Sequence, residues 1–231
     1  ILNMEENVEV AVLEMGMSGK GEIELLSKLA KPHVAVITNI GESHLLDLGS
    51  REGIAEAKLE ILTGLKENGV LVFNGDEPLL RDRINQQALA VRSFGRSKQN
   101  TIYPLHIAAG NENTRFTTNT IQEEMMIPIL GHHNVLNALA AISVATELQV
   151  SPDLIRKGLS ELRITGMRME MVVGAKGEKI INDAYNASPT AMKAAIELVS
   201  ELTGFQNKYL VLGDMLELGA EEVTFHQMIG E

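Results

Sequence analysis

Near the start of the chain, apolar positions form two short runs with a helical pattern between them. Valines alternate with polar or small residues over 8–13 and the run ends at Glu14, which predicts a strand. Residues 22–30 have a helical pattern, and residues 33–38 form a second, almost wholly apolar strand. Such strands, joined by helices, indicate a parallel sheet with helices on both faces. Ligands bind beyond the carboxyl ends of these strands, so Glu14 and the loop 39–44 are candidate site positions.

The pattern continues along the chain and changes twice. We expect a helix over 50–65 that Ser50 caps, followed by strands over 70–73 and 91–94. Short antiparallel hairpins are expected over 105–130, at the edge of the sheet. Two further helices are expected, one over 134–148 and one from Ser151 onward, with this serine as its cap. After Gly166 we expect a hairpin over 169–182, a helix over 190–202, a strand over 209–212 and a helix to the end of the chain. The expected fold class is α/β: a mostly parallel sheet with an antiparallel edge region over 1–166, then the first half of a second α/β domain over 167–231.

Charge and composition narrow the choice of partners. The chain has 20 Lys and Arg against 31 Asp and Glu, a formal charge of −11, which disfavours nucleic acids and anionic membrane surfaces. The absence of cysteine excludes disulfides and thiolate metal sites and fits a reducing cytoplasm. No apolar run reaches the ~18 residues of a membrane span. We therefore expect a soluble, cytoplasmic chain that binds small molecules.

A glycine-flanked lysine, Lys20, invites comparison with a phosphate-binding loop but has the wrong spacing. That loop needs GxxxxGK[ST], with a hydroxyl side chain after the lysine. Here only two residues separate Gly16 from Gly19, and Gly21 follows the lysine. We therefore reject this segment as a phosphate loop.

Lys58 occupies an inward-facing position on the helix expected over 50–65. It lies four residues after Ile54 and three before Ile61, on the apolar stripe. A lysine at such a position ordinarily buries its stem and extends its ammonium group to water. The alternative is a desolvated amine with a lowered pKa, able to react with carbon dioxide and become a carbamate, a carboxylate-like metal ligand. The spacing leaves both interpretations open.

Glu14 and His44 follow two expected strands of the same sheet, with His44 in the loop 39–44. Either side chain could be an ordinary loop residue. Neighbouring parallel strands lie only ~5 Å apart, however, so the two side chains and Lys58 could converge on one point. Three candidate ligands in one cleft are a hypothesis for a metal site.

Polar side chains also gather at the start of the long helix and after the expected domain boundary. His133 and Asn134 begin that helix, and Asn137 lies one turn further on the face of Asn134. Carboxamides donate and accept hydrogen bonds, so this pair could read an adenine edge, although N-capping by Asn134 fits the pattern equally well. Arg168 could bind a phosphate or a surface carboxylate, and Asp183 could bind a ribose hydroxyl or cap a turn.

Taken together, these segments resemble the Mur ligase family, the ATP-dependent amide-forming ligases of peptidoglycan precursor synthesis. The motifs occur in the family's order: Glu14-x-Gly16, the loop 39–44, Ala57-Lys58-x-Glu60-Ile61, the run 131–137, Gly166-x-Arg168 and the run 183–189. The resemblance covers nearly the whole chain. An ordered set is more specific than any single motif, so it favours the functional interpretation of each.

The resemblance implies a P-loop-type ATPase-like central ligase domain over 1–166 and the N-terminal part of a Rossmann-like C-terminal domain over 167–231. It implies ATP and Mg²⁺ as cofactors, with Mn²⁺ as an alternative because a histidine ligand suits that ion better. The implied roles are metal binding for Glu14, His44 and a carbamylated Lys58, catalysis for His44 and Lys58, adenine binding for His133, Asn134 and Asn137, further nucleotide contacts for Arg168 and Asp183, and a position near the acceptor carboxylate for Asn39.

Within the family, the runs 183–189 and 212–219 are most similar to members that join D-alanyl-D-alanine to UDP-N-acetylmuramoyl-tripeptide. The resemblance thus implies these two small-molecule substrates, an acyl phosphate intermediate and a monomer. Two alternatives stay open. One is a sister amide ligase, from the Mur family or a folylpolyglutamate synthase, that accepts another amine; the other is a non-catalytic nucleotide-binding module.

The chain also departs from the family's pattern. It begins at Ile1, contains no GxxxxGK[ST] loop and has no uridine-nucleotide domain. In the family that loop precedes the strand expected over 8–13. We therefore expect an upstream segment that carries the loop, weak ATP binding by this chain on its own, and no turnover by it.

Overall fold

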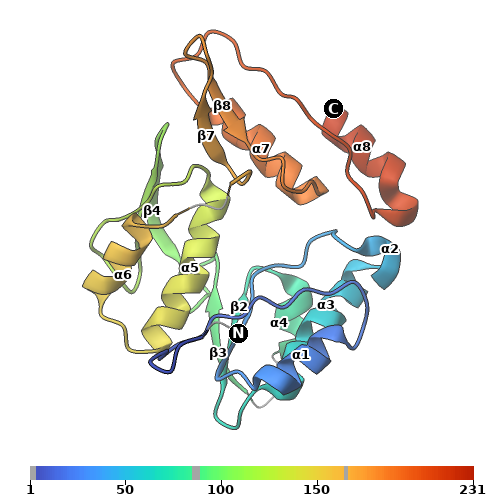
Figure 1. Cartoon of the computed structure of the whole chain (residues 1–231), viewed down its shortest axis with the longest axis vertical. Coiled ribbons are helices and arrows are strands. Elements are labelled where there is room, and N and C mark those ends of the chain that lie inside the picture. Colours follow the sequence, from blue (N-terminus) through green and yellow to red (C-terminus); the bar gives the residue numbers. More distant parts are fainter. Residues whose placement is uncertain (1–3, 85–88, 164–165) are drawn as a thin grey trace.

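The structure is a computed structural model that describes residues 4–84, 89–163 and 166–231. We call residues 4–163 the N-terminal part and residues 166–231 the C-terminal part. Figure 1 shows the N-terminal part built around two sheets and the C-terminal part lying over one end of it. Among the helices in these ranges, none combines the length and the apolar character needed to cross a bilayer.

A parallel sheet lies at the centre of the N-terminal part. Its strands are β1 (Val34–Ile37), β2 (Val70–Asn74) and β3 (Ala90–Phe94), in the order β1-β2-β3. Helices α1 (Glu22–Ala30), α3 (Arg51–Leu59) and α4 (Pro78–Ile84) cover one face, and α5 (His132–Glu147) covers the other. Leu71 and Phe73 pack toward the first group of helices, whereas Val72 packs toward α5. The expected parallel sheet with helices on both faces is confirmed.

The helix expected over 50–65 begins as predicted but changes type. The Ser50 hydroxyl accepts a hydrogen bond from the Gly53 amide at 3.1 Å, so the predicted cap is confirmed. After α3 the chain tightens into the 3₁₀ helix η1 (Glu60–Gly64). This turn packs so closely on α1 that a Cβ at Gly64 would lie 2.1 Å from the Ser27 carbonyl oxygen. Position 64 therefore has no room for a side chain against α1.

The predicted antiparallel region forms a sheet of its own. Strands β4 (Pro104–Ala109), β5 (Thr114–Thr118) and β6 (Met125–Ile127) pair antiparallel in that order. A single isolated bridge, Phe94 to Ile102, joins this region to the end of β3. The hairpins are therefore confirmed, and they lie beside the edge strand β3, although they form a separate sheet. Helix α6 (Pro152–Ser160) packs against β6, and Ser151 precedes it without a side-chain cap bond.

The C-terminal part has a smaller core. It contains the hairpin β7 (Glu170–Val173) and β8 (Lys179–Asn182), then α7 (Pro189–Glu201), the 3₁₀ turn η2 (Gly219–Glu221) and α8 (Glu222–Gly230). One cluster joins Met169 and Leu198 to Leu130 of the N-terminal part. A second cluster holds Met192, Met215 and Leu218. The first cluster thus contributes to the contact between the two parts.

Two predicted strands are absent from the described part of the chain. The segments 8–13 and 209–212 are coil and pair with no strand, and Val12 and Val211 are 91% and 97% exposed. A strand is stable only where a neighbour accepts and donates its backbone hydrogen bonds. The alternation of apolar residues is therefore not sufficient here, because neither segment has a pairing partner within the described ranges. The helix α2 (Leu45–Leu48), in contrast, was not anticipated.

Candidate functional site

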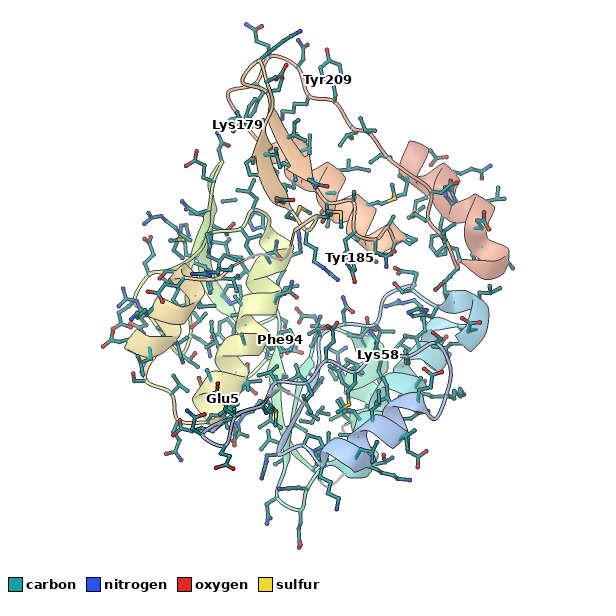
Figure 2. The ribbon with its side chains drawn as sticks, viewed as in Figure 1. Glu5, Lys58, Phe94, Lys179, Tyr185 and Tyr209 are labelled. Atoms are coloured by element: carbon teal, nitrogen blue, oxygen red, sulfur yellow. The ribbon has the colours of Figure 1, made fainter. Side chains whose placement is uncertain are left out.

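The loop after β1 connects two of the predicted site residues. Lys58 lies on α3 in the N-terminal part (Figure 2). Its ammonium group donates a hydrogen bond to the Asn39 carbonyl oxygen at 2.9 Å, so it reaches the carboxyl end of β1. Its side chain is half-buried, and this burial lowers the pKa of the amine from its usual value. A desolvated amine has a larger neutral fraction at a given pH. The reactive interpretation requires this burial and this direction of the pKa, and it stays a prediction for Lys58.

His44 lies further along the same loop, where it precedes α2. Its backbone is left-handed, with a φ of 66°, and its side chain makes no capping bond to that helix. Its buried Nδ1 lies 2.8 Å from a carboxylate oxygen of Glu217, in the C-terminal part. This oxygen is at ion-pair distance but outside the angular range of a hydrogen bond. Sequence reasoning did not anticipate Glu217, because its contact with His44 spans almost the whole chain.

Arg51 is a second residue that the sequence did not reveal. Its guanidinium group donates to the Ile40 carbonyl at 2.9 Å and to the Glu77 carboxylate at 2.7 Å. It thereby fixes the beginning of the loop that carries His44 to the start of α4. An arginine at the first position of a helix is an ordinary surface residue in sequence, so no pattern marked it.

Glu14 lies apart from this arrangement. The prediction that it ends a buried strand is wrong, because the segment before it is an exposed coil. Its carboxylate makes no hydrogen bond or ion pair within residues 4–84, 89–163 and 166–231. The same ranges contain no group of three His, Cys, Asp or Glu side chains that could hold a metal ion. His44 and Lys58 flank one loop. If Lys58 is carbamylated, the two side chains would supply a nitrogen and an oxygen donor to a metal ion. That Glu14 reaches the same ion stays a prediction.

The three polar side chains predicted at the start of α5 form one network. Asn134 Nδ2 donates a hydrogen bond to the Leu130 backbone carbonyl at 2.8 Å and lies 3.1 Å from His133 Nε2. Asn137 Nδ2 donates to Asn134 Oδ1 at 3.2 Å. N-capping by Asn134 is wrong, because Gly131 is the cap residue and Asn134 lies inside the helix. Asn134 mainly orients its neighbours, whereas Asn137 Oδ1 and His133 Nδ1 have no hydrogen-bond partner among the described residues.

The network at α5 begins beside the contact with the C-terminal part, because Leu130 packs against Met169, whose amide binds Asp183. Burial lowers the pKa of His133, and the charge of Arg96 acts in the same direction, whereas the Asp183 and Glu197 carboxylates oppose the shift. Asp183 also accepts a hydrogen bond from the Met169 amide at 3.0 Å, which joins the two strands of the hairpin. Residues predicted to bind one nucleotide therefore lie on both sides of the contact between the two parts.

Arg168 has a partner that the sequence did not reveal. Its guanidinium carbon lies 4.2 Å from the centre of the Tyr185 ring, in a cation–π arrangement. Tyr185 is exposed and belongs to the run 183–189, which also contains Asp183. The ring holds the arginine beside the expected nucleotide-binding residue without neutralising its charge.

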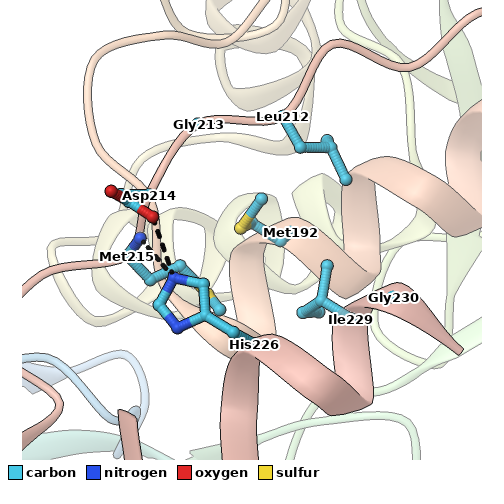
Figure 3. Close-up of a pocket in the computed structure, with 8 residues that line it drawn as sticks. All are labelled: Met192, Leu212, Gly213, Asp214, Met215, His226, Ile229 and Gly230. Carbon is cyan, nitrogen blue, oxygen red and sulfur yellow. Dashed lines mark hydrogen bonds and ion pairs between the residues drawn. The ribbon is translucent and has the colours of Figure 1, made fainter. Parts of the chain in front are cut away.

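A cavity of about 500 Å³ lies elsewhere, between α7, α8 and the segment before η2 (Figure 3). His226 is its main polar side chain. Its Nδ1 lies 2.8 Å from the Glu222 carbonyl, and its Nε2 accepts a hydrogen bond from the Met215 amide at 3.2 Å, with Asp214 3.4 Å away. Both ring nitrogens are thus engaged in holding the local structure. No predicted site residue lines this cavity.

Relatives of known identity match the whole chain. It is 56% identical to the UDP-N-acetylmuramoyl-tripeptide–D-alanyl-D-alanine ligase of Bacillus subtilis, with all of this chain and 50% of that protein covered, and 32% identical to the Escherichia coli ligase of the same name, with 52% of it covered. The chain therefore spans about half the length of these curated relatives.

Solved structures agree with the fold. MurF from Acinetobacter baumannii superposes with a TM-score of 0.91 and 32% identity, over 99% of this chain and 50% of that chain. MurF ligase from Thermotoga maritima, solved in complex with ADP, has a TM-score of 0.83 and 30% identity over 94% of this chain and 50% of that chain. These similarities confirm the predicted α/β fold class.

Two family profiles also match the chain. The profile of the Mur ligase middle domain matches residues 1–145, and that of the Mur ligase glutamate ligase domain matches residues 167–231. The first match alone covers more than half of the residues. The chain therefore belongs to the Mur ligase family.

Proposed function

We propose that this chain forms part of an ATP-dependent ligase that adds D-alanyl-D-alanine to UDP-N-acetylmuramoyl-tripeptide in peptidoglycan precursor synthesis. The observation that carries the proposal is that the α5 network and Asp183 border the same contact between the two parts, where Leu130 packs against Met169 and the Met169 amide binds Asp183. A nucleotide held there would touch both parts at once. The 56% identity to the Bacillus subtilis ligase supports the choice of substrates.

The proposed reaction proceeds in two balanced steps. A terminal carboxylate oxygen of the tripeptide attacks the γ-phosphorus of ATP, which forms an acyl phosphate and releases ADP. The amine of D-alanyl-D-alanine then attacks the acyl carbon, loses a proton and expels inorganic phosphate. Because the acyl phosphate is easily hydrolysed, both steps need a site from which water is excluded.

The chain's own residues have distinct roles in this proposal. His133 and Asn137 contact the adenine, with Asn134 orienting both, while Asp183 binds the ribose and Arg168 the phosphates. Asn39 lies near the acceptor carboxylate, beside Lys58. His44 and a carbamylated Lys58 would hold Mg²⁺ or Mn²⁺ at the loop after β1, and Glu14 would complete the site if it approaches them in the intact ligase. The ion would neutralise the charge that gathers on the phosphates. His44 and Lys58 border the reacting groups and are the catalytic candidates.

We further propose that residues 1–166 are the central ATP-binding domain and that residues 167–231 begin the C-terminal domain. The chain contains no GxxxxGK[ST] segment, and we propose that the intact ligase supplies the phosphate loop from another part of its sequence. A cytoplasmic, monomeric enzyme fits the absence of cysteine and the nucleotide substrates.

The test is phosphate release by the intact ligase that contains this chain. With ATP and UDP-N-acetylmuramoyl-tripeptide present, we expect release that depends on D-alanyl-D-alanine. Release that depends instead on L-alanine, D-glutamate or L-glutamate would identify a sister ligase. Absence of release with every amine, although ATP binds, would favour a non-catalytic nucleotide-binding module.

The isolated chain provides a second test. Calorimetric titration with ATP and Mg²⁺ should detect only weak binding and no hydrolysis, because the backbone amides and the lysine of a phosphate loop are missing. Tight binding with hydrolysis would contradict this part of the proposal.

A further inference from the structure

His44 is held from outside its own loop. Within the N-terminal part, its carbonyl oxygen accepts hydrogen bonds from the Asp47 and Leu48 amides, but these bonds fix the backbone and not the imidazole. The helix that follows it has only four residues and receives no side-chain bond from His44. The group that faces the buried Nδ1 is the Glu217 carboxylate, 2.8 Å away. The direction of the ring therefore depends on the C-terminal part.

Glu217 belongs to a segment that is firmly anchored. Met215 and Leu218, on either side of it, are 1% and 2% exposed and pack in the same apolar cluster. The Glu217 backbone is left-handed, with a φ of 63°, a conformation that a non-glycine residue adopts only where the surroundings hold it. The buried neighbours thus present this carboxylate in one direction, although its own side chain is half exposed.

Two further contacts hold the His44 loop to the same surface. The Leu46 amide donates to the Glu217 carbonyl oxygen at 3.1 Å, so backbone and side chain of Glu217 both engage this loop. The Thr190 hydroxyl, at the start of α7, donates to the Glu42 carboxylate at 2.7 Å. These contacts approach the loop from both sides of His44 and make its position depend on the docked C-terminal part.

We propose that Glu217 is a positioning residue for His44. Because Nδ1 faces Glu217, Nε2 is the nitrogen that the ring presents to a ligand. The ring takes this orientation only when the C-terminal part is docked. Carboxylate partners commonly orient imidazoles that act at a metal or phosphate. The expected effect on turnover rests on the proposed function, whereas the orientation of the His44 ring by Glu217 does not.

The first experiment measures the ring itself. In this chain, labelled at the histidine side-chain nitrogens, the His44 resonances are identified by their loss in His44→Gln. We expect Glu217→Ala to shift the His44 ring resonances and the Leu46 amide, while Glu221→Ala leaves them in place. Glu221 is the matched control, since it is an acidic residue of the adjoining turn η2 without an ion pair in the described part of the chain. Identical spectra for the two alanine variants would overturn the proposal.

The second experiment measures turnover of the intact ligase. Loss of an outer partner of a functional histidine typically costs about 10- to 100-fold in activity, so we expect that loss in kcat for Glu217→Ala, with KM for D-alanyl-D-alanine unchanged. Glu217→Gln should restore most of it, because an amide of the same size can take the same place beside Nδ1 and can donate to or accept from a neutral imidazole. A Gln variant as impaired as the Ala variant would mean that charge and not position matters, which would contradict the proposal.

A double-mutant comparison separates positioning from an independent role. In a His44→Ala background, Glu217→Ala should cause no further loss of kcat, because its effect passes through the missing ring. Additive losses would exclude positioning. If the intact protein does not use D-alanyl-D-alanine at all, the proposed function fails, while the resonance shift of His44 still decides the geometric inference.

Discussion

Gly131, which has no Cβ, allows the backbone conformation at the start of α5. Gly131 caps this helix with a φ of +94°, and a Cβ added there would lie 2.7 Å from Cε1 of the His133 ring. The glycine therefore serves both the backbone conformation and the placement of His133. Sequence alone indicated a helix start at this point but not that the asparagine amides would be used among themselves.

Replacing this glycine gives a direct test of its role. Gly131→Ala should lower the free energy of unfolding by about 1–3 kcal/mol, because alanine is strained at a positive φ and its methyl group displaces the His133 ring. Urea unfolding followed by circular dichroism measures the change. Gly158→Ala is the matched control: it lies within α6 with nothing near its added Cβ, and should stabilise by about 0.5–1 kcal/mol. Equal effects at the two positions would contradict this account.

Lys58 illustrates what a helical pattern can and cannot predict. The apolar stripe correctly predicts that the side chain points inward, where it reaches the Asn39 carbonyl. The pattern does not reveal how much water surrounds the amine, since that depends on packing between distant segments. The lowered pKa follows from this burial.

In the intact ligase we expect Lys58→Ala to reduce kcat by about 100-fold or more, as for the loss of a group that stabilises developing charge. A short carboxylic acid such as acetate should restore part of the activity by replacing a carbamate. Lys157→Ala, an exposed lysine on α6, serves as the control and should leave kcat unchanged. Full activity of Lys58→Ala would remove this residue from the site.

The half-buried imidazole of His133 makes the stability of the protein depend on pH. Its pKa lies below the usual value of about 6.5 because burial penalises the charged ring, with Arg96 and His132 adding to the shift and Asp183 and Glu197 opposing it. As pH falls below that usual value the unfolded chain binds a proton first, so the free energy of unfolding decreases until the folded pKa is passed.

The measurement compares urea midpoints at pH 7.5 and 5.5 for the protein and for His133→Gln. The variant should lose less stability on acidification, because the remaining histidines titrate in both proteins and their contributions cancel. A larger acid sensitivity in the variant would show that the sign of the shift is wrong.

Among the elements, those whose hydrogen bonds or packing are local were predictable. Helix α1 has the predicted bounds, and the hairpin β7–β8 lies where the turn residues place it. The strands expected over 8–13 and 209–212 failed for one shared reason: alternation specifies an extended chain, but a strand also needs a neighbour. The separation of the antiparallel sheet from β1–β3 likewise depends on contacts that no local pattern encodes.

The two unpaired segments should tolerate substitution in this chain. Val12→Thr and Val211→Thr are expected to change the free energy of unfolding by less than about 0.5 kcal/mol, since both side chains are almost fully exposed. Leu71→Ala, at a fully buried position of β2, should cost about 2–5 kcal/mol. Chemical denaturation provides all three values, and a large loss at either valine would mean that its segment is paired in solution.

In the whole molecule, polar contacts and one apolar cluster join the two parts. The Asn111 amide bonds the Thr203 carbonyl at 3.2 Å at one end, and Thr190 bonds Glu42 at the other. Exposed polar contacts contribute little stability individually. Leu130 is 4% exposed and packs with Met169 and Leu198, so we expect it to contribute much of the free energy of docking. The sequence predicted residues of the candidate site on both parts, but only this packing brings them to face each other.

Leu130→Ala should accordingly loosen the contact between the parts without melting the N-terminal core. Removing a buried leucine costs about 2–5 kcal/mol, and here we expect the loss in the C-terminal part, whose own clusters are small. Native-state hydrogen exchange should become faster in α7 and β7 while β2 stays protected. Ile142→Ala, at a fully buried position in the N-terminal core, is the control and should accelerate exchange in β2 as well. If Leu130→Ala also accelerated exchange throughout β2, the two parts would unfold as one cooperative unit. The C-terminal part could then not undock by itself, and closure on a nucleotide could not be described as the docking of one stable part on another.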